Sequence, residues 1–251
     1  MVKRRGPDGF ARAWILPLLL VVLAPPAAAE DLNFALGLKE RYVSLRRTLK
    51  LENQTSSGLK THRVEAPRSD GTWMSTAALN GSFRRWFVGA QASAASFNVF
   101  EQPSSFSSPS FIRNSTVDLT QMDLALGYTI LTGVSPYVGY MRHRQTTDLD
   151  CAGCTKTVVL SRVGPGLLLD YPVENTRWAA YLNLSLIQGG AIEGGLGYAG
   201  IRWPFVAAAG FGYRRIDYPA NRVSCRPSGG FACFRENDVV SGPILSLHYI
   251  F

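Results

Sequence analysis

Three histidines are the side chains of this 251-residue chain best suited to acid–base chemistry. An imidazole changes its charge near neutral pH, so histidine is the usual general base of hydrolytic enzymes. The nearest approach to a catalytic set is His143 with Asp148 and Asp150, while His62 and His248 lie far from it in the sequence. No second acidic pair accompanies His143, and no serine stands beside a histidine in a recognisable lipolytic motif. We therefore predict no catalytic residue, no metal and no cofactor, and keep a hydrolase as an alternative.

Four cysteines form two groups, Cys151-Ala-Gly-Cys154 and the pair Cys225 and Cys233. The C-x-x-C spacing could hold zinc or act as a redox pair, but the second spacing is wide and no βαβ context surrounds the first. In an oxidising compartment disulfides are the default, and four cysteines allow three connectivities. We favour local closure, Cys151 with Cys154 and Cys225 with Cys233, because partners in separate loops would otherwise have to meet.

The first 29 residues have the layout of a cleavable signal peptide. Basic residues come first, the apolar stretch 15–26 follows, and the run Ala27-Ala28-Ala29 precedes Glu30. We expect export, cleavage after residue 29 and a single mature domain over residues 30–251. The mature charge of about +5 is mild, and no block of Lys and Arg suggests a nucleic-acid partner.

Short alternating segments dominate the rest of the chain, and no run of 18 apolar residues suggests a transmembrane helix. In the segment 121–130, for example, Met122, Leu124 and Leu126 alternate with Asp123 and small residues. Successive side chains of a strand point to opposite faces, so this period of two indicates strands. We predict ten strands, with boundaries near 31–44, 72–79, 83–97, 116–130, 136–145, 157–171, 177–187, 192–202, 205–216 and 238–251.

The connections between these segments alternate between short and long. Asn80-Gly81 is a two-residue hairpin signal, and short turns also suit the regions near Gly133, Asn175 and Pro204. Long connections are expected within 39–72, 101–115, 146–156 and 217–237. The pattern predicts an all-β, antiparallel up-and-down transmembrane barrel with one plain end and one decorated end. Several glycines between 186 and 202 blur the alternation, and without that pair of strands the barrel would have eight.

The polar face of the predicted strands decides between a soluble and a membrane barrel. Small residues and scattered charges cannot fill a soluble core, whereas a membrane barrel has an apolar exterior and a polar lumen. We therefore predict a polar lumen network of charged side chains. Its members are Arg85, Asp123, Arg142, Arg162, Asp170, Glu193 and Arg214. These residues could fill a largely plugged interior or line a narrow small-solute pore.

The last residues of the chain carry a more specific signal. Apolar or aromatic residues occupy every second position up to the final ring, at Leu245, Leu247, Tyr249 and Phe251. The sequence thereby resembles the small outer-membrane β-barrel proteins of Gram-negative bacteria, the OmpA/OmpX-like or porin-like barrels. The resemblance implies an outer-membrane location, lipid and lipopolysaccharide around the barrel, and periplasmic chaperones and the barrel-assembly machinery as partners. It also implies that residues 245–251 are the assembly signal, although Pro243 departs from the pattern.

Three functions follow in order of preference. The first is a structural or surface-interaction barrel that acts through long extracellular loops. The second is the narrow pore, and the third is an outer-membrane enzyme acting on lipid A or peptides, for which His143, Asp148 and Asp150 would resemble an omptin-like set. In the first function, the basic stretch within 39–72 could meet lipid phosphates. Its cations are Lys39, Arg41, Arg46, Arg47, Lys50, Lys60 and Arg63.

Overall fold

The computed structural model describes residues 32–55, 58–65, 69–101, 113–149, 155–200, 204–219, 224–225 and 231–251. The predicted signal peptide lies outside them. The described residues form twelve strands: β1 (Leu32–Thr55), β2 (Gly58–Glu65), β3 (Thr72–Phe83), β4 (Trp86–Glu101), β5 (Arg113–Tyr128), β6 (Val134–Leu149), β7 (Thr155–Pro172), β8 (Trp178–Ser185), β9 (Ala191–Ala199), β10 (Phe205–Asp217), β11 (Ser224–Cys225) and β12 (Phe231–Ile250). This part of the chain contains no helix long and apolar enough to cross a membrane.

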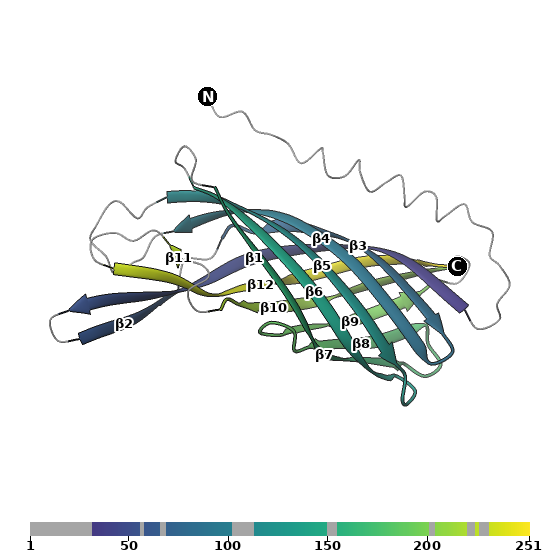
Figure 1. The fold of residues 1–251 in the computed structure, drawn as a ribbon. Coiled ribbons are helices and arrows are strands. Elements are labelled where there is room, and N and C mark those ends of the chain that lie inside the picture. Colours follow the sequence, from purple (N-terminus) through teal and green to yellow (C-terminus); the bar gives the residue numbers. More distant parts are fainter. Residues whose placement is uncertain are drawn as a thin grey trace, which may run out of the picture.

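Ten of the strands close into an antiparallel up-and-down barrel (Figure 1). Each strand from β3 to β10 pairs with its neighbours, and β12 pairs with both β10 and β1. The short strands β2 and β11 extend the sheet beside β1 and β12 at one end. Both β8 and β9 are present, so the prediction of ten barrel strands is confirmed. Because the last strand pairs with the first, the barrel has no free edge along this closure.

The predicted hairpin at Asn80-Gly81 is wrong. Both residues lie inside β3, and the turn follows at Arg84 and Arg85, with Arg84 at φ 56°. The glycine serves packing instead, since a Cβ at Gly81 would lie 3.1 Å from the Phe34 ring. The Asn-Gly pair, which is typical of turns, therefore led us to end the predicted strand at residue 79 instead of at Phe83.

The predicted long basic connection within 39–72 is also wrong, because most of it is strand. β1 continues to Thr55, pairing with β12 as far as Asn53 and with β2 on its other side. Its inward positions include Lys39, Arg41 and Arg47, so these cations face the barrel interior rather than lipid.

The outward face of the strands changes character part-way up the barrel. Near the short turns it is apolar, as at Leu38, Leu126 and Val138, and further along the same strands it becomes polar, as at Thr116 and Arg142. We call these two parts the membrane tier and the upper tier. An apolar exterior requires lipid, whereas a polar exterior requires water.

The inward face changes in the opposite sense. In the upper tier it carries an apolar core, formed by Val43, Leu45, Met74, Phe97, Val99, Val117, Leu119 and Val240. In the membrane tier it carries the polar side chains described below. The chain therefore combines a membrane barrel with a water-facing barrel built from the same strands.

Aromatic pairs mark both borders of the membrane tier. Near the short turns, three ring pairs lie 4.9 to 5.0 Å apart between centroids: Trp86 with Tyr128, Trp178 with Tyr198, and Phe205 with Tyr249. At the opposite border Tyr42 and Trp73 lie 5.4 Å apart. Such girdles are typical of the two interfaces of a membrane barrel, and short turns are typical of its periplasmic end.

Candidate functional site in the barrel interior

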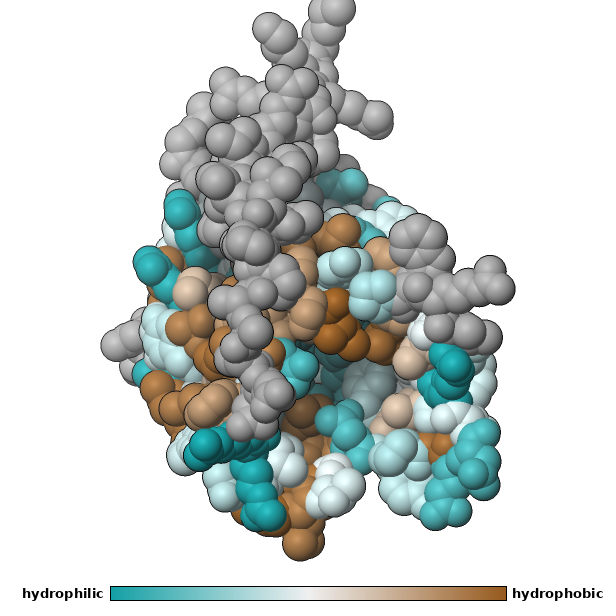
Figure 2. All heavy atoms as spheres, turned by 90° about the vertical axis from the view of Figure 1, so that its right-hand side faces the viewer, coloured by the Kyte–Doolittle hydropathy of each residue, from teal (hydrophilic) through white to brown (hydrophobic). Residues whose placement is uncertain are grey.

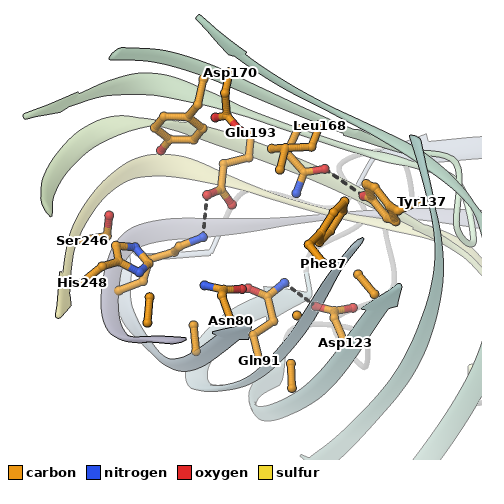
Figure 3. A pocket seen from close by; sticks show the side chains of 18 of the residues that line it. Asn80, Phe87, Gln91, Asp123, Tyr137, Leu168, Asp170, Glu193, Ser246 and His248 are labelled. Carbon is orange, nitrogen blue, oxygen red and sulfur yellow. Dashed lines mark hydrogen bonds and ion pairs between the residues drawn. The ribbon is translucent and has the colours of Figure 1, made fainter. Parts of the chain in front are cut away.

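A cavity of about 590 Å³ occupies the interior of the membrane tier. Its lining runs from Asn33, Ser82 and Ile250 beside the short turns up to Arg214 and Ile187. Figure 2 looks onto the short-turn end, where a recess opens between hydrophobic and hydrophilic residues. Figure 3 shows amide, aromatic and charged side chains that enter the cavity from opposite walls, among them Asn80, Phe87 and Glu193.

A layer of ion pairs crosses the inner end of this cavity. Glu193 on β9 accepts from Lys39 Nζ and from Arg41 Nη2 on β1, each at 2.5 Å. Arg214 on β10 lies 3.0 Å from Asp123 on β5. These side chains are only 12 to 15% exposed, so each charge depends on its partner for solvation.

Amides and hydroxyls complete this layer. Gln91 Nε2 donates to Asp123 Oδ2 at 3.0 Å, and the Tyr137 hydroxyl donates to Asn183 Oδ1 at 2.8 Å. The Tyr137 ring lies on Gly166, where a Cβ would overlap the ring. The layer is therefore held by contacts from both sides of the lumen.

A second polar cluster lies in the upper tier, enclosed by the apolar core. Asp238 on β12 accepts from Arg47 Nε at 3.1 Å and from Gln145 Nε2 at 3.1 Å. The Tyr218 hydroxyl lies 2.9 Å from Gln145 Oε1 and 3.0 Å from Asp238 Oδ2, and Arg235 Nη1 donates to Gln145 Oε1 at 2.5 Å. Burial, with the nearby carboxylate of Asp238, raises the pKa of Tyr218, so this hydroxyl keeps its proton and acts as a donor.

His143 lies buried in the upper tier, and its placement corrects the predicted parity of β6. Because strand residues alternate between faces, the predicted lumen position of Arg142 put its neighbours Met141 and His143 on the lipid side, but both are fully buried inside the barrel. Neither ring nitrogen of His143 has a hydrogen-bond partner among the described residues. The histidine is not exposed to the cavity or to solvent, which argues against a role as a base. Asp148 has no described side chain, and Asp150 lies outside the described residues.

Four residues of the predicted lumen network lie where the prediction put them. Asp123, Glu193 and Arg214 belong to the ion-pair layer, and Asp170 lines the cavity. His248 also lines the cavity.

The other three members need correction. Arg85 is exposed in the β3–β4 turn, and Arg142 is exposed on the outward face of β6, because Met141 and His143 take the inward positions. Arg162 has inward parity but is exposed, since no strand among the described residues covers that side of β7 at its level. The alternation of residues in the sequence could not show that the neighbouring strand stops below this level of β7.

Sequence reasoning also missed several lumen cations and one buried acid. These residues lie on inward positions of β1 and β12, two strands that were predicted to be shorter or were partly treated as loops. They are Lys39, Arg41, Arg47 and Asp238. The signal was available for β1, where the alternation continues past residue 44 with Leu45 and Arg47 on one face.

The cysteine groups lie almost wholly outside the described side chains. Cys151 and Cys154 are not described, and the backbone register places Cys225 opposite Cys233 across β11 and β12. The side chain of His62 is likewise not described. Within the described residues no group of histidine, cysteine and acidic side chains is arranged to hold a metal ion.

No family model and no curated protein matches the sequence. The structure, in contrast, is similar to the outer membrane protease OmpT from Escherichia coli, with a TM-score of 0.54 and 9% identity, over 90% of this chain and 99% of that one. The fold is that of a Gram-negative outer-membrane β-barrel.

More distant structural matches are barrels of the same kind. Neisserial surface protein A matches with a TM-score of 0.35 and 10% identity, over 86% of this chain and 96% of that one. The translocator domain of the autotransporter NalP from Neisseria meningitidis has a TM-score of 0.37 and 12% identity, over 95% of both chains. At 9% identity the match to OmpT shows the fold alone.

Proposed function

We propose that this protein is a non-conducting outer-membrane barrel that acts at the cell surface through its upper tier. The observation that carries the proposal is the filled interior above the cavity. The ion-pair layer of Glu193 and Asp123 is followed by Met141 and His143, and then by the apolar core around the pair Arg47 and Asp238. Small barrels are just wide enough for side chains to fill, which supports a plugged rather than an open lumen.

The shape of the upper tier supports the surface role. Strands β1, β6, β7 and β12 have 16 to 24 residues, whereas crossing the membrane takes about 9–11. The surplus forms a water-facing wall beyond the border marked by Tyr42 and Trp73. A wall with an apolar core and a polar exterior has the build of a folded surface domain. A buried His143 without a described partner gives no support to a catalytic role.

Conductance in planar bilayers tests the plugged interior. We expect no stable unitary steps from the full chain. Steps whose ion selectivity changes in Glu193→Gln, but not in Glu40→Gln, would show that ions pass the lumen charge layer and would overturn the proposal. Glu40 is a suitable control because it follows Lys39, a partner of Glu193, on β1 but faces outward, where its carboxylate accepts from the Ser75 hydroxyl.

Epitope labelling tests which tier faces the outside. A tag inserted between β1 and β2 should bind antibody on intact cells. The same tag inserted at Asn175, in the β7–β8 turn, should be labelled only after the cells are permeabilised. The reverse pattern would place the upper tier in the periplasm and would contradict the surface role.

A further inference from the structure

The barrel wall has a notch above the turn between β8 and β9. β7 pairs with β8 only from Gly166 onward, and β9 pairs with β10 only as far as Arg214. No described strand covers residues 155–165 of β7 on that side. Figure 1 shows that β8 and β9 end before the upper tier, which the longer strands of the barrel reach. The notch therefore separates the upper halves of β7 and β10.

Side chains close the notch from within, so it is a recess and not an opening into the lumen. The turn is tied to both walls, with Leu186 N donating to Pro165 O at 3.0 Å and Arg215 N donating to Gly190 O at 2.9 Å. Ile187 is buried in the barrel beside Gly139 and Gly164. Above it, Leu160, Ile216 and Tyr218 form an apolar cluster.

Two arginines lie at the sides of the recess and are joined across it. Arg162 Nε on β7 donates to Gln188 Oε1 at 2.8 Å, and the Gln188 amide donates to the carbonyl of Asp217. Arg215 Nε donates to Asp217 Oδ1 at 2.7 Å. Both guanidiniums remain exposed to the outside, because neither Gln188 nor the single carboxylate of Asp217 covers them.

Further positive charge lies beside β7. Arg142 and Arg144 project outward from β6, where their backbone partners on β7 are Ser161 and Val159. Within the described residues neither guanidinium has an ion-pair partner. Around the notch these four arginines are accompanied by two carboxylates, Asp217 and Glu236, that interact with Arg215, which leaves a local excess of positive charge.

The level of the notch coincides with the upper border of the membrane tier. Directly below it the exterior is apolar, with Leu186 75% and Val163 66% exposed. Acyl chains would cover these side chains, since an exposed apolar wall of a membrane barrel is the lipid-contacting surface. The arginines lie where the headgroups of those lipids begin.

We propose that the notch binds the phosphate-bearing headgroup of a membrane lipid, whose acyl chains lie over Val163 and Leu186. Guanidinium groups form charge-assisted, bidentate hydrogen bonds with phosphate oxygens, and Arg162 and Arg215 can approach one headgroup from both sides of the recess. Gln188 holds Arg162 at the rim. The site rests on the membrane barrel of the proposed function but not on the plugged lumen.

Native mass spectrometry of the detergent-solubilised full chain tests this site. The probes are phosphatidic acid and phosphatidylcholine with identical acyl chains, and inorganic phosphate. We expect the chain to retain phosphatidic acid about 25-fold more than phosphatidylcholine, and to retain no inorganic phosphate, because each of the two cations contributes roughly a factor of five to binding an anionic lipid. The double variant Arg162→Gln/Arg215→Gln should lose this preference.

The matched control is Arg84→Gln/Arg85→Gln, which removes the same charge at the short-turn end. Equal loss in both double variants, or equal retention of the two lipids by the unaltered chain, would overturn the proposal. So would retention of inorganic phosphate in place of the lipid. If Arg162→Gln/Arg215→Gln fails to fold on a heat-modifiability gel, Arg142→Gln/Arg144→Gln carries the test, and unchanged preference in that variant would overturn it. A conducting lumen would contradict the proposed function and leave this result unaffected.

Discussion

Arg47 and Asp238 are direct backbone partners where the first and last barrel strands meet, and their side chains form an ion pair with Nε 3.1 Å from Oδ1. They lie 191 positions apart in the chain, and each side chain is 1% exposed. The two side chains can therefore form this buried ion pair only when β1 and β12 close the barrel. Gln145 and Tyr218 complete the shell of Asp238.

Removing one partner of this pair should destabilise the barrel strongly. Asp238→Leu leaves the buried Arg47 without its carboxylate, which typically costs about 3–5 kcal/mol in the free energy of unfolding. The double variant Arg47→Met/Asp238→Leu should recover most of the loss, because well-packed apolar residues can replace a buried ion pair. Urea unfolding in detergent micelles measures both. If Asp238→Leu were as stable as the unaltered chain, groups other than the Asp238 carboxylate would have to stabilise the charge of Arg47.

His143 should be replaceable with a gain in stability. Its two ring nitrogens are buried without a hydrogen-bond partner among the described residues, and an unsatisfied buried polar group costs about 1–3 kcal/mol. Leucine is apolar and of similar size, so His143→Leu should raise the free energy of unfolding in urea by about 1 kcal/mol. His248→Leu is the control, since His248 lines the wide cavity and can meet water there. A destabilised His143→Leu would reveal a buried water or partner.

The membrane tier could be predicted from the sequence because one rule holds throughout it. Met122, Leu124 and Leu126 face outward and Asp123 faces inward, as the alternation requires. The final strand also followed the rule, with Leu245 and Leu247 on the outside. A period of two together with apolar residues on one face is sufficient wherever lipid covers that face.

The upper tier could not be predicted with the same rule, because water covers its exterior. There Met141 and His143 fill the interior and Arg142 faces outward, the reverse of the lipid-side assignment. The ion pairs across the lumen were out of reach for another reason. Glu193 meets Lys39 154 positions away, and such a contact depends on the stagger of all the strands between them.

Gly166 should tolerate no side chain, because the ring of Tyr137 occupies the space above it. A Cβ at Gly166 would overlap that ring, so Gly166→Ala must displace Tyr137 and its 2.8 Å hydrogen bond to Asn183. Overpacking of this kind costs about 1–3 kcal/mol. Gly197→Ala is the matched control, since its Cβ would have its nearest neighbour at 3.6 Å, an ordinary contact. Thermal unfolding followed by gel shift compares the two, and equal stability would mean that the ring moves freely.

The ring of Phe251 should matter for assembly more than its backbone does. Phe251 N donates to Phe34 O at 2.8 Å, which joins the chain end to the first strand, while its ring lies 4.7 Å from that of Tyr249, itself 4.9 Å from Phe205. Phe251→Ala keeps the backbone bond and removes the ring, so it separates the two contributions. We expect the folded, heat-modifiable fraction in outer-membrane preparations to fall severalfold in Phe251→Ala and to persist in Phe251→Tyr, because an aromatic ring at this interface anchors the closing strand.

The control is Leu131→Ala, which alters an exposed apolar residue in the β5–β6 turn and should assemble normally. If Phe251→Ala inserted as well as the control, the hydrogen bond to Phe34 alone would suffice for closure, and residues 245–251 would carry no assembly signal in their final ring.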